Sequence, residues 1–185
     1  DRYIERARDA CRRMRVRHMR DFSHVMQHIR RCGFEADHVT VHQRDSWKKR
    51  FPRTRFIPRT GIIEYGRRQK RPEELRALRR AERITEELLR RVPRVLRGGI
   101  REQELAWKLQ LWAHELGADG LAFAPIVAFG AHTSRPHHSP TRRALRKGDI
   151  VQIDVGAKYQ WYCADRSAVY FTGEPTGAQR KAYTA

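Results

Sequence analysis

The sequence has few of the features that mark a secreted, disulfide-bonded or membrane-spanning protein. It contains only three cysteines among 185 residues, widely separated and without a Cys-x-x-Cys pair, so neither a disulfide framework nor a zinc knuckle is indicated. No apolar run approaches the roughly 20 residues of a membrane-spanning helix, and no signal peptide is evident. We therefore expect reduced thiols, a cytoplasmic location and no membrane partner.

Acidic residues are also scarce. There are 21 Asp and Glu against 40 Lys and Arg, which gives a formal net charge of +19. Such an excess permits binding to nucleic acid or to an acidic membrane surface. The basic residues are spread through the chain, with no array interleaved with aromatic residues, so an arginine-rich proteome is the favoured explanation. Nucleic-acid binding stays open as the alternative.

The pattern of elements predicts an α+β protein with a boundary at residues 66–71. Pro72, followed by two glutamates, favours the start of a long helix through its fixed φ and the helix dipole. A second helix with Glu104 at its third position is predicted to end at Gly117. The other predicted elements are two helical pieces within residues 1–32 ended by Gly33, a strand within 33–41, a short helix near 47–51, strands at 56–57, 62–63 and 121–129, and a polar loop over 130–140.

Residues 147–165 predict a β-hairpin. Apolar residues at 151, 153 and 155 alternate with polar ones, which is the period of a half-buried strand. A turn centred near Tyr159 and Gln160 would place Asp154 opposite Asp165, where like charges destabilise a sheet. A cation bound by both carboxylates, or a bridged pair of cations, would offset this repulsion. A register shifted by one residue would instead leave one Asp facing solvent.

Four short runs follow one another at a recognisable spacing: FAPIVAFG at 123–130, Pro-His at 136–137, Lys-Gly-Asp to Asp-Val-Gly at 147–156, and Tyr-Cys-Ala-Asp at 162–165. Together they resemble the pita-bread metallopeptidases, the relatives of methionine aminopeptidase, Xaa-Pro aminopeptidase, prolidase and creatinase. The run at 33–40 is similar to the end of the creatinase-type N-terminal domain. The resemblance implies a creatinase-like α/β piece over residues 1–68 and the N-terminal half of a pita-bread catalytic domain over 69–185.

The resemblance also implies a site. Asp154 and Asp165 match the first two carboxylate ligands of a dinuclear metal centre, and His137 matches the histidine that contacts substrate. His132 and His138 are expected to be ordinary solvated loop residues. The implied cofactors are two divalent ions, with Mn²⁺ favoured and Zn²⁺, Co²⁺ or Fe²⁺ as alternatives. The implied substrate is a proline-containing peptide, and a homodimer is compatible with the resemblance.

Two segments depart from the family pattern. Ser167-Ala168-Val169 stand where the family has Thr-Arg-Thr, and His132-Thr133 stand where its loop often has Asn-Ser. The family's other ligands, one histidine and two glutamates, lie further along than Ala185. We therefore expect a fragment of an Xaa-Pro aminopeptidase or dipeptidase that by itself binds metal poorly, is inactive, and exposes the apolar side of residues 151–155. An inert pita-bread protein that binds nucleic acid or ribosomes is the alternative.

Overall fold

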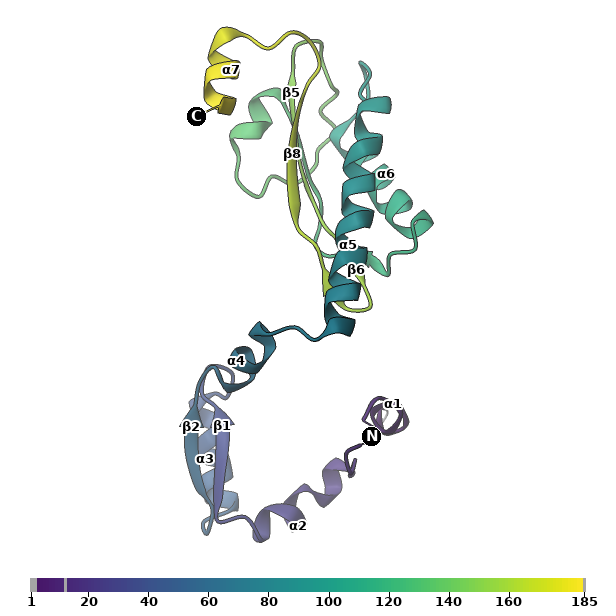
Figure 1. The fold of residues 1–185 in the computed structure, drawn as a ribbon. Coiled ribbons are helices and arrows are strands. Elements are labelled where there is room, and N and C mark those ends of the chain that lie inside the picture. Colours follow the sequence, from purple (N-terminus) through teal and green to yellow (C-terminus); the bar gives the residue numbers. More distant parts are fainter. Residues whose placement is uncertain (1–2, 12, 185) are drawn as a thin grey trace. The chain divides into compact units, whose positions relative to one another are not determined.

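The structure is a computed structural model that describes residues 3–11 and 13–184. The chain forms two compact units, Asp1–Gln69 and Lys70–Ala185, which are drawn in Figure 1. In the described part of the chain, no helix combines the length and the apolar composition needed to cross a bilayer.

The first unit is built on two parallel strands joined by a helix. Strand β1 (Arg31–Glu35) pairs with β2 (Arg55–Arg59), and α3 (Val41–Arg50) connects them. Thr40 caps α3 because its hydroxyl accepts a hydrogen bond from the Gln43 amide while the Gln43 side chain accepts one from the Thr40 amide. The same unit also contains α1 (Ile4–Ala10), the 3₁₀ helix η1 (Met19–Asp21), α2 (Phe22–Gln27) and α4 (Ile62–Arg68).

Two local predictions in this unit are wrong. Helix α2 ends at Gln27, and Gly33, which was predicted to stop it, lies inside β1 and pairs with Ile57. Pairing with a distant strand outweighs the local stop signal of a glycine. Residues 62–63 were predicted to be a strand but begin α4, because Gly61 takes a left-handed conformation with φ 66° and turns the chain away from β2.

The second unit packs two helices against an antiparallel sheet. The sheet has the order β4-β5-β8, formed by Ile126–Phe129, Ile150–Val155 and Arg166–Phe171. The helices are α5 (Pro72–Arg91) and α6 (Glu102–Glu115). A smaller sheet, in the order β3-β6-β7, consists of Gly120–Leu121, Ala157–Tyr159 and Tyr162–Cys163. Short helices η2 (Val92–Arg94), η3 (Gly130–Ser134) and α7 (Gly177–Thr184) complete the unit.

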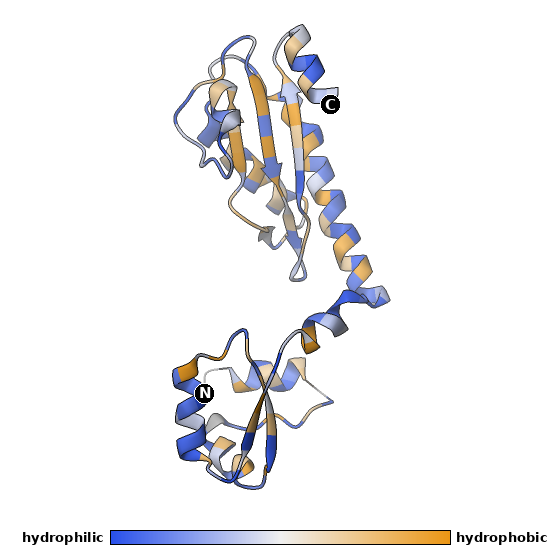
Figure 2. Cartoon of the chain, turned by 90° about the vertical axis from the view of Figure 1, so that its left-hand side faces the viewer, coloured by the Kyte–Doolittle hydropathy of each residue, from blue (hydrophilic) through white to orange (hydrophobic). Residues whose placement is uncertain are grey.

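The core of this unit lies between the helices and the larger sheet. Its fully buried members include Ile84 and Leu88 of α5, Leu105 and Leu109 of α6, and the apolar residues of β5 at positions 151, 153 and 155. Figure 2 shows the central strands largely hydrophobic, whereas α5 alternates between hydrophilic and hydrophobic residues along its length. The expectation that the apolar side of β5 would lie open is therefore wrong. The two helices that precede it in sequence cover it.

The hairpin forms, but in a different register from the predicted one. Gln160 and Trp161 both have positive φ, 49° and 70°, and form a two-residue turn between the paired Tyr159 and Tyr162. Asp154 therefore pairs with Ser167 and not with Asp165. The turn is centred one residue further along than predicted, so each pairing shifts by two residues. A shift of two keeps a side chain on its original face, which leaves the two aspartates as diagonal neighbours.

Candidate metal and peptide site

One cavity of the second unit collects all three residues that the sequence singled out. Its volume is about 440 Å³, and His137, Asp154 and Asp165 lie in its wall. Asp154 comes from β5, Asp165 from the connection between β7 and β8, and His137 from the loop that follows η3. The other lining residues are Phe123, Ala124, Pro125, Ile126, His138, Ser139 and Pro140. The cavity thus has a carboxylate side and a largely apolar side.

The two carboxylates have no cationic partner among the residues that the structure describes. Asp154 is half-buried and accepts a hydrogen bond from the Ser167 hydroxyl over 3.1 Å, while Asp165 is exposed. Neither forms an ion pair with a described Arg, Lys or His, although the chain carries 40 Lys and Arg. Unneutralised carboxylate oxygens are ligands that Mn²⁺ and similar divalent ions prefer. The donor set therefore fits a divalent metal.

Gly156 allows the chain to bring these carboxylates together. A Cβ at this position would lie 1.8 Å from the carbonyl oxygen of Ala164, the residue before Asp165. Two backbone hydrogen bonds fix the crossing: Gly156 O accepts from the Ala122 amide over 2.7 Å, and Ala157 O accepts from the Ala164 amide over 2.9 Å. The side chain that is missing at residue 156 leaves room for the connection between β7 and β8, which carries Asp165.

His137 occupies an unusual backbone conformation. Its φ is 55°, in the left-handed region that residues other than glycine rarely adopt. Its side chain is exposed, whereas that of the next residue, His138, is buried. Strained backbone of this kind persists only where the surroundings hold it, and it is common at functional sites.

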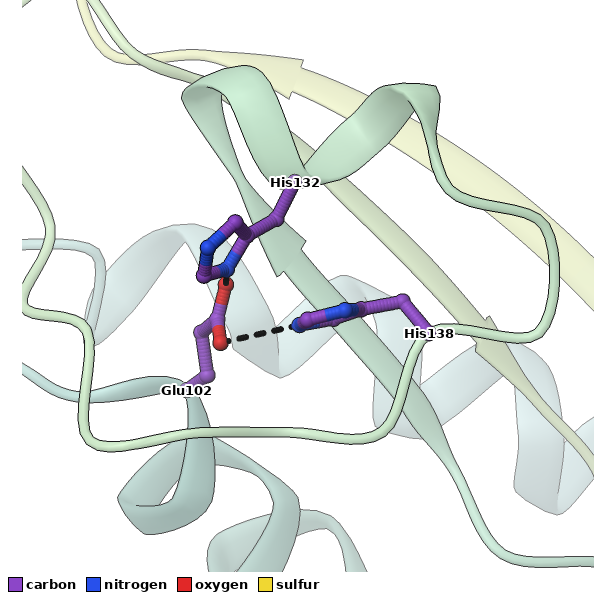
Figure 3. A group of neighbouring side chains, drawn as sticks. All are labelled: Glu102, His132 and His138. Atoms are coloured by element: carbon purple, nitrogen blue, oxygen red, sulfur yellow. Dashed lines mark hydrogen bonds and ion pairs between the residues drawn. The ribbon is translucent and has the colours of Figure 1, made fainter.

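The surroundings of His137 are held by a residue that the sequence reasoning missed. Glu102, at the first position of α6, has no exposed surface. Its Oε1 accepts from the Phe129 amide over 2.9 Å and lies 2.8 Å from His132 Nδ1. Its Oε2 lies 3.0 Å from His138 Nε2 and accepts from the amide and the hydroxyl of Thr141, over 2.9 and 2.6 Å. Figure 3 shows both imidazoles turned toward this carboxylate.

These contacts set the charge state of Glu102. Burial by itself would raise the pKa of its carboxyl group, but hydrogen bonds from the Thr141 hydroxyl, His138 and the Phe129 and Thr141 amides outweigh it. Together they lower the pKa of Glu102 from 4.5 to about 2. The expectation that His132 and His138 are solvated is wrong, because one ring nitrogen of each histidine contacts this buried anion. The only signal in the sequence was a glutamate in the first turn of a helix, which is ordinary at that position.

Glu102, His132 and His138 also resemble a set of metal ligands, since their ligand atoms lie within 4.8 Å of one another. A carboxylate offers about four lone-pair positions. Five donors already surround that of Glu102: the amides of Phe129 and Thr141, the Thr141 hydroxyl and the two imidazoles. The carboxylate of Glu102 therefore has no lone pair left for a metal ion, and the aspartate pair is the better candidate for a metal site.

The fold of the second unit, an antiparallel sheet backed by two helices with a carboxylate pair on its other side, is that of the pita-bread hydrolases. Residues 76–185 match the sequence model of metallopeptidase family M24, and residues 1–69 match that of the creatinase/prolidase N-terminal domain. The chain therefore belongs to metallopeptidase family M24. This confirms the predicted fold: a creatinase-like α/β unit followed by the N-terminal part of a pita-bread domain.

Relatives and solved structures agree with this assignment. The chain is 30% identical over 155 residues to the uncharacterized peptidase YqhT of Bacillus subtilis, covering 84% of this chain and 44% of that protein. It is similar to an Xaa-Pro dipeptidase from Bacillus anthracis, with a TM-score of 0.90, 27% identity, and coverage of 99% and 53% of the two chains. An X-Pro aminopeptidase from Thermotoga maritima gives a TM-score of 0.77, 28% identity, and coverage of 89% and 48%. The chain spans about half the length of these relatives.

Proposed function

We propose that the protein is a metal-dependent peptidase that cleaves the bond between an N-terminal residue and proline. The observation that carries this proposal is the single cavity that joins Asp154, Asp165 and His137 in a chain of metallopeptidase family M24. Similarity to an Xaa-Pro dipeptidase and an X-Pro aminopeptidase supports the choice of bond. We do not propose nucleic-acid binding, because these similar proteins are peptidases.

In this proposal Asp154 and Asp165 would hold two divalent ions, with Mn²⁺ favoured and Zn²⁺, Co²⁺ or Fe²⁺ as alternatives. When bound, the ions would lower the pKa of a water molecule to give a nucleophile at neutral pH and would polarise the scissile carbonyl. The Ser167 hydroxyl, at 3.1 Å from Asp154 Oδ1, orients one of these carboxylates. A hydroxyl is thus retained at this position although the neighbouring Arg of the family pattern is absent.

His137 and the apolar wall would act on the peptide itself. An exposed imidazole in the cavity wall can donate a hydrogen bond to the carbonyl oxygen as negative charge develops on it, which lowers the barrier to attack. Phe123, Pro125 and Ile126 line the same cavity and offer apolar surface to a pyrrolidine ring. Proline in the substrate would bury apolar area there without leaving an amide hydrogen unpaired, since its nitrogen carries none.

The proposal for the 185 residues by themselves is narrower. The family resemblance implies three more ligands, one histidine and two glutamates, with one glutamate as general base. Two carboxylates supply only part of the coordination that a pair of ions requires. We therefore propose that the 185-residue chain binds Mn²⁺ weakly and does not turn over peptide without these ligands.

The test is hydrolysis of an Xaa-Pro dipeptide by the full-length protein with added Mn²⁺. Asp154→Ala and Asp165→Ala should abolish turnover, and His137→Ala should lower kcat by about 10²-fold, as loss of one donor to a developing oxyanion does. Asp119→Ala is the matched control, because Asp119 is an exposed aspartate of the same unit outside the cavity lining. Full activity in Asp154→Ala or Asp165→Ala would refute the assignment.

Isothermal titration of the 185-residue chain with Mn²⁺ tests the narrower proposal. We expect weak binding and no turnover. Micromolar binding of two ions together with peptide hydrolysis would show that these residues suffice, and would overturn it.

A further inference from the structure

Among the described residues, Glu102 is a charged side chain with no exposed surface that lies outside the cavity of the proposed site. We propose that Glu102 is a positioning residue: its ionised carboxylate fixes the loop of residues 130–141 and thereby the direction in which His137 enters the cavity. The inference rests on the proposed function for the role of His137, but the fixing of the loop can be tested without it.

The carboxylate of Glu102 contacts four residues, which lie on both sides of His137 in the chain. Oε1 contacts Phe129, the last residue of β4, and His132 in η3. Oε2 contacts His138 and Thr141, which come after His137 in the chain. Both ends of the segment that carries His137 are therefore tied to the same buried atoms on α6. Figure 3 shows the two imidazoles approaching Glu102 from different parts of the loop.

The backbone around Glu102 is itself hydrogen-bonded to the end of the loop. The amide of Glu102 donates to Arg143 O over 3.1 Å, and the amide of Gln103 donates to Thr141 O over 3.1 Å. The residue before Glu102, Arg101, forms an isolated antiparallel bridge with Ala144. The start of α6 is thus a rigid support, and a side chain that projects from it holds its partners within a narrow range of positions.

The anchored loop also determines the conformation of His137. His138 is buried with its ring against Glu102, and the adjacent residue 137 has the left-handed φ of 55°. This conformation is unfavourable for a residue with a side chain, so it has to be maintained by contacts on its neighbours. With His138 fixed inward and φ of residue 137 reversed, the His137 side chain is directed into the cavity that holds Asp154 and Asp165.

The negative charge is needed because every partner is a donor or can be one. Glutamine in place of Glu102 would direct an NH₂ group at one of the two sets of donors. Either the Phe129 and His132 side or the Thr141 and His138 side would then lose its acceptor. Glu104→Gln is the matched control: Glu104 lies two residues along the same helix, is exposed, and accepts a hydrogen bond from the Arg101 amide over 3.2 Å.

The experiment measures kcat and KM of the full-length protein for an Xaa-Pro dipeptide in a double-mutant cycle. Glu102→Gln should lower kcat by about 10- to 100-fold with KM changed less than about threefold, and Mn²⁺ affinity should be retained. In the His137→Ala background the same substitution should have almost no further effect, because residues that act through one another are not additive. An equal loss of kcat in both backgrounds, or full activity in a folded Glu102→Gln, would overturn the inference.

A second readout separates this inference from the proposed function. In the 185-residue chain, Glu102→Gln should speed hydrogen exchange at the Phe129 and Thr141 amides and alter the rate at which diethyl pyrocarbonate modifies His137, whereas Glu104→Gln should do neither. If the wild-type protein hydrolyses no peptide, the proposed function fails, while these rates still decide whether the loop is anchored. Unchanged exchange and modification rates would refute the anchoring.

Two other outcomes are also decisive. Loss of stoichiometric Mn²⁺ or Zn²⁺ binding in Glu102→Gln, with binding retained in Asp154→Ala, would show that the Glu102 cluster is a metal site and would overturn the inference. If Glu102→Gln does not fold, Thr141→Val removes the hydroxyl donor while keeping the amide donor. It should lower kcat in the same direction by a few-fold in the wild type and not in His137→Ala, and the absence of this difference would count against the inference.

Discussion

Substitution of Gly156 by alanine tests how the hairpin brings the two aspartates together. The added Cβ would lie 1.8 Å from Ala164 O, 2.7 Å from the Ala164 carbonyl carbon and 3.1 Å from the Phe123 ring. Atoms in ordinary contact lie more than 3.4 Å apart, and the two nearest atoms belong to backbone. The backbone at Ala164, between β7 and β8, must therefore move, since no side-chain rotation relieves the clash.

The size of the effect follows from the contacts that this movement breaks. The hydrogen bonds from the Ala164 amide to Ala157 O and from the Ala122 amide to Gly156 O would be lost or lengthened, at about 1 kcal/mol each. Overpacking of a close contact costs a further ~1–3 kcal/mol. We expect Gly156→Ala to lower the free energy of unfolding by about 3–5 kcal/mol, a large part of the ~5–15 kcal/mol that domains have.

The assay is urea unfolding of the second unit within the 185-residue chain, followed by circular dichroism. Gly98→Ala is the matched control, because a Cβ at Gly98 meets nothing within 4 Å and its φ is not positive. The control should change stability by less than about 1 kcal/mol. A change below about 1 kcal/mol in Gly156→Ala, with the Ala164 amide still protected from exchange, would refute the reasoning.

Two further predictions concern buried polar groups. Thr85 is fully buried, and its hydroxyl accepts from the Ala157 amide over 2.9 Å while donating to Ala81 O. Thr85→Val should therefore lower the free energy of unfolding by about 1–3 kcal/mol, because it leaves the buried Ala157 amide unpaired. Thr85→Ser keeps the hydroxyl and should retain the protection of that amide in hydrogen exchange, so equal protection in the two variants would contradict the prediction. The pKa of Glu102 is lowered from 4.5 to about 2 in the folded chain, so its stabilising contribution of about 3 kcal/mol is present above pH 4.5 and is lost as the pH falls toward 2. The urea midpoint of unfolding, measured as a function of pH, should fall over this range in the wild type and not in Glu102→Gln. Parallel pH dependences of the midpoint in the two proteins would count against the prediction.

Local patterns in the sequence were sufficient for several elements. Alternation along residues 150–155 predicts β5 because a strand with one buried face needs apolar residues at every second position. Pro72 and Glu104 fall at the helix positions expected from the chemistry of helix starts, and α5 and α6 begin accordingly. The aspartates and His137 were found by their motifs, and their roles as ligands and as a contact to substrate remain predictions.

The hairpin register could not be predicted because its turn lacks the usual signal. Two-residue turns with positive φ at both positions favour glycine, asparagine or aspartate, whereas this one uses Gln160 and Trp161. Burial of Val151, Ile153 and Val155 does not decide between the two registers, because a shift of two residues keeps each side chain on the same face. The observed register differs in the pairs that it forms, such as Asp154 with Ser167.

By itself, then, the sequence determined the alternating strand, the helix starts and the residue types that can bind a metal, because each depends on neighbours a few positions away. Only the tertiary structure decided the partners of Glu102. They lie 27 to 39 residues further along the chain, and their donors meet at one carboxylate only once α6, β4 and the loop have packed together. A buried anion is tolerated there because five donors replace the water that it loses on burial. No local pattern in the sequence indicates that these donors come together.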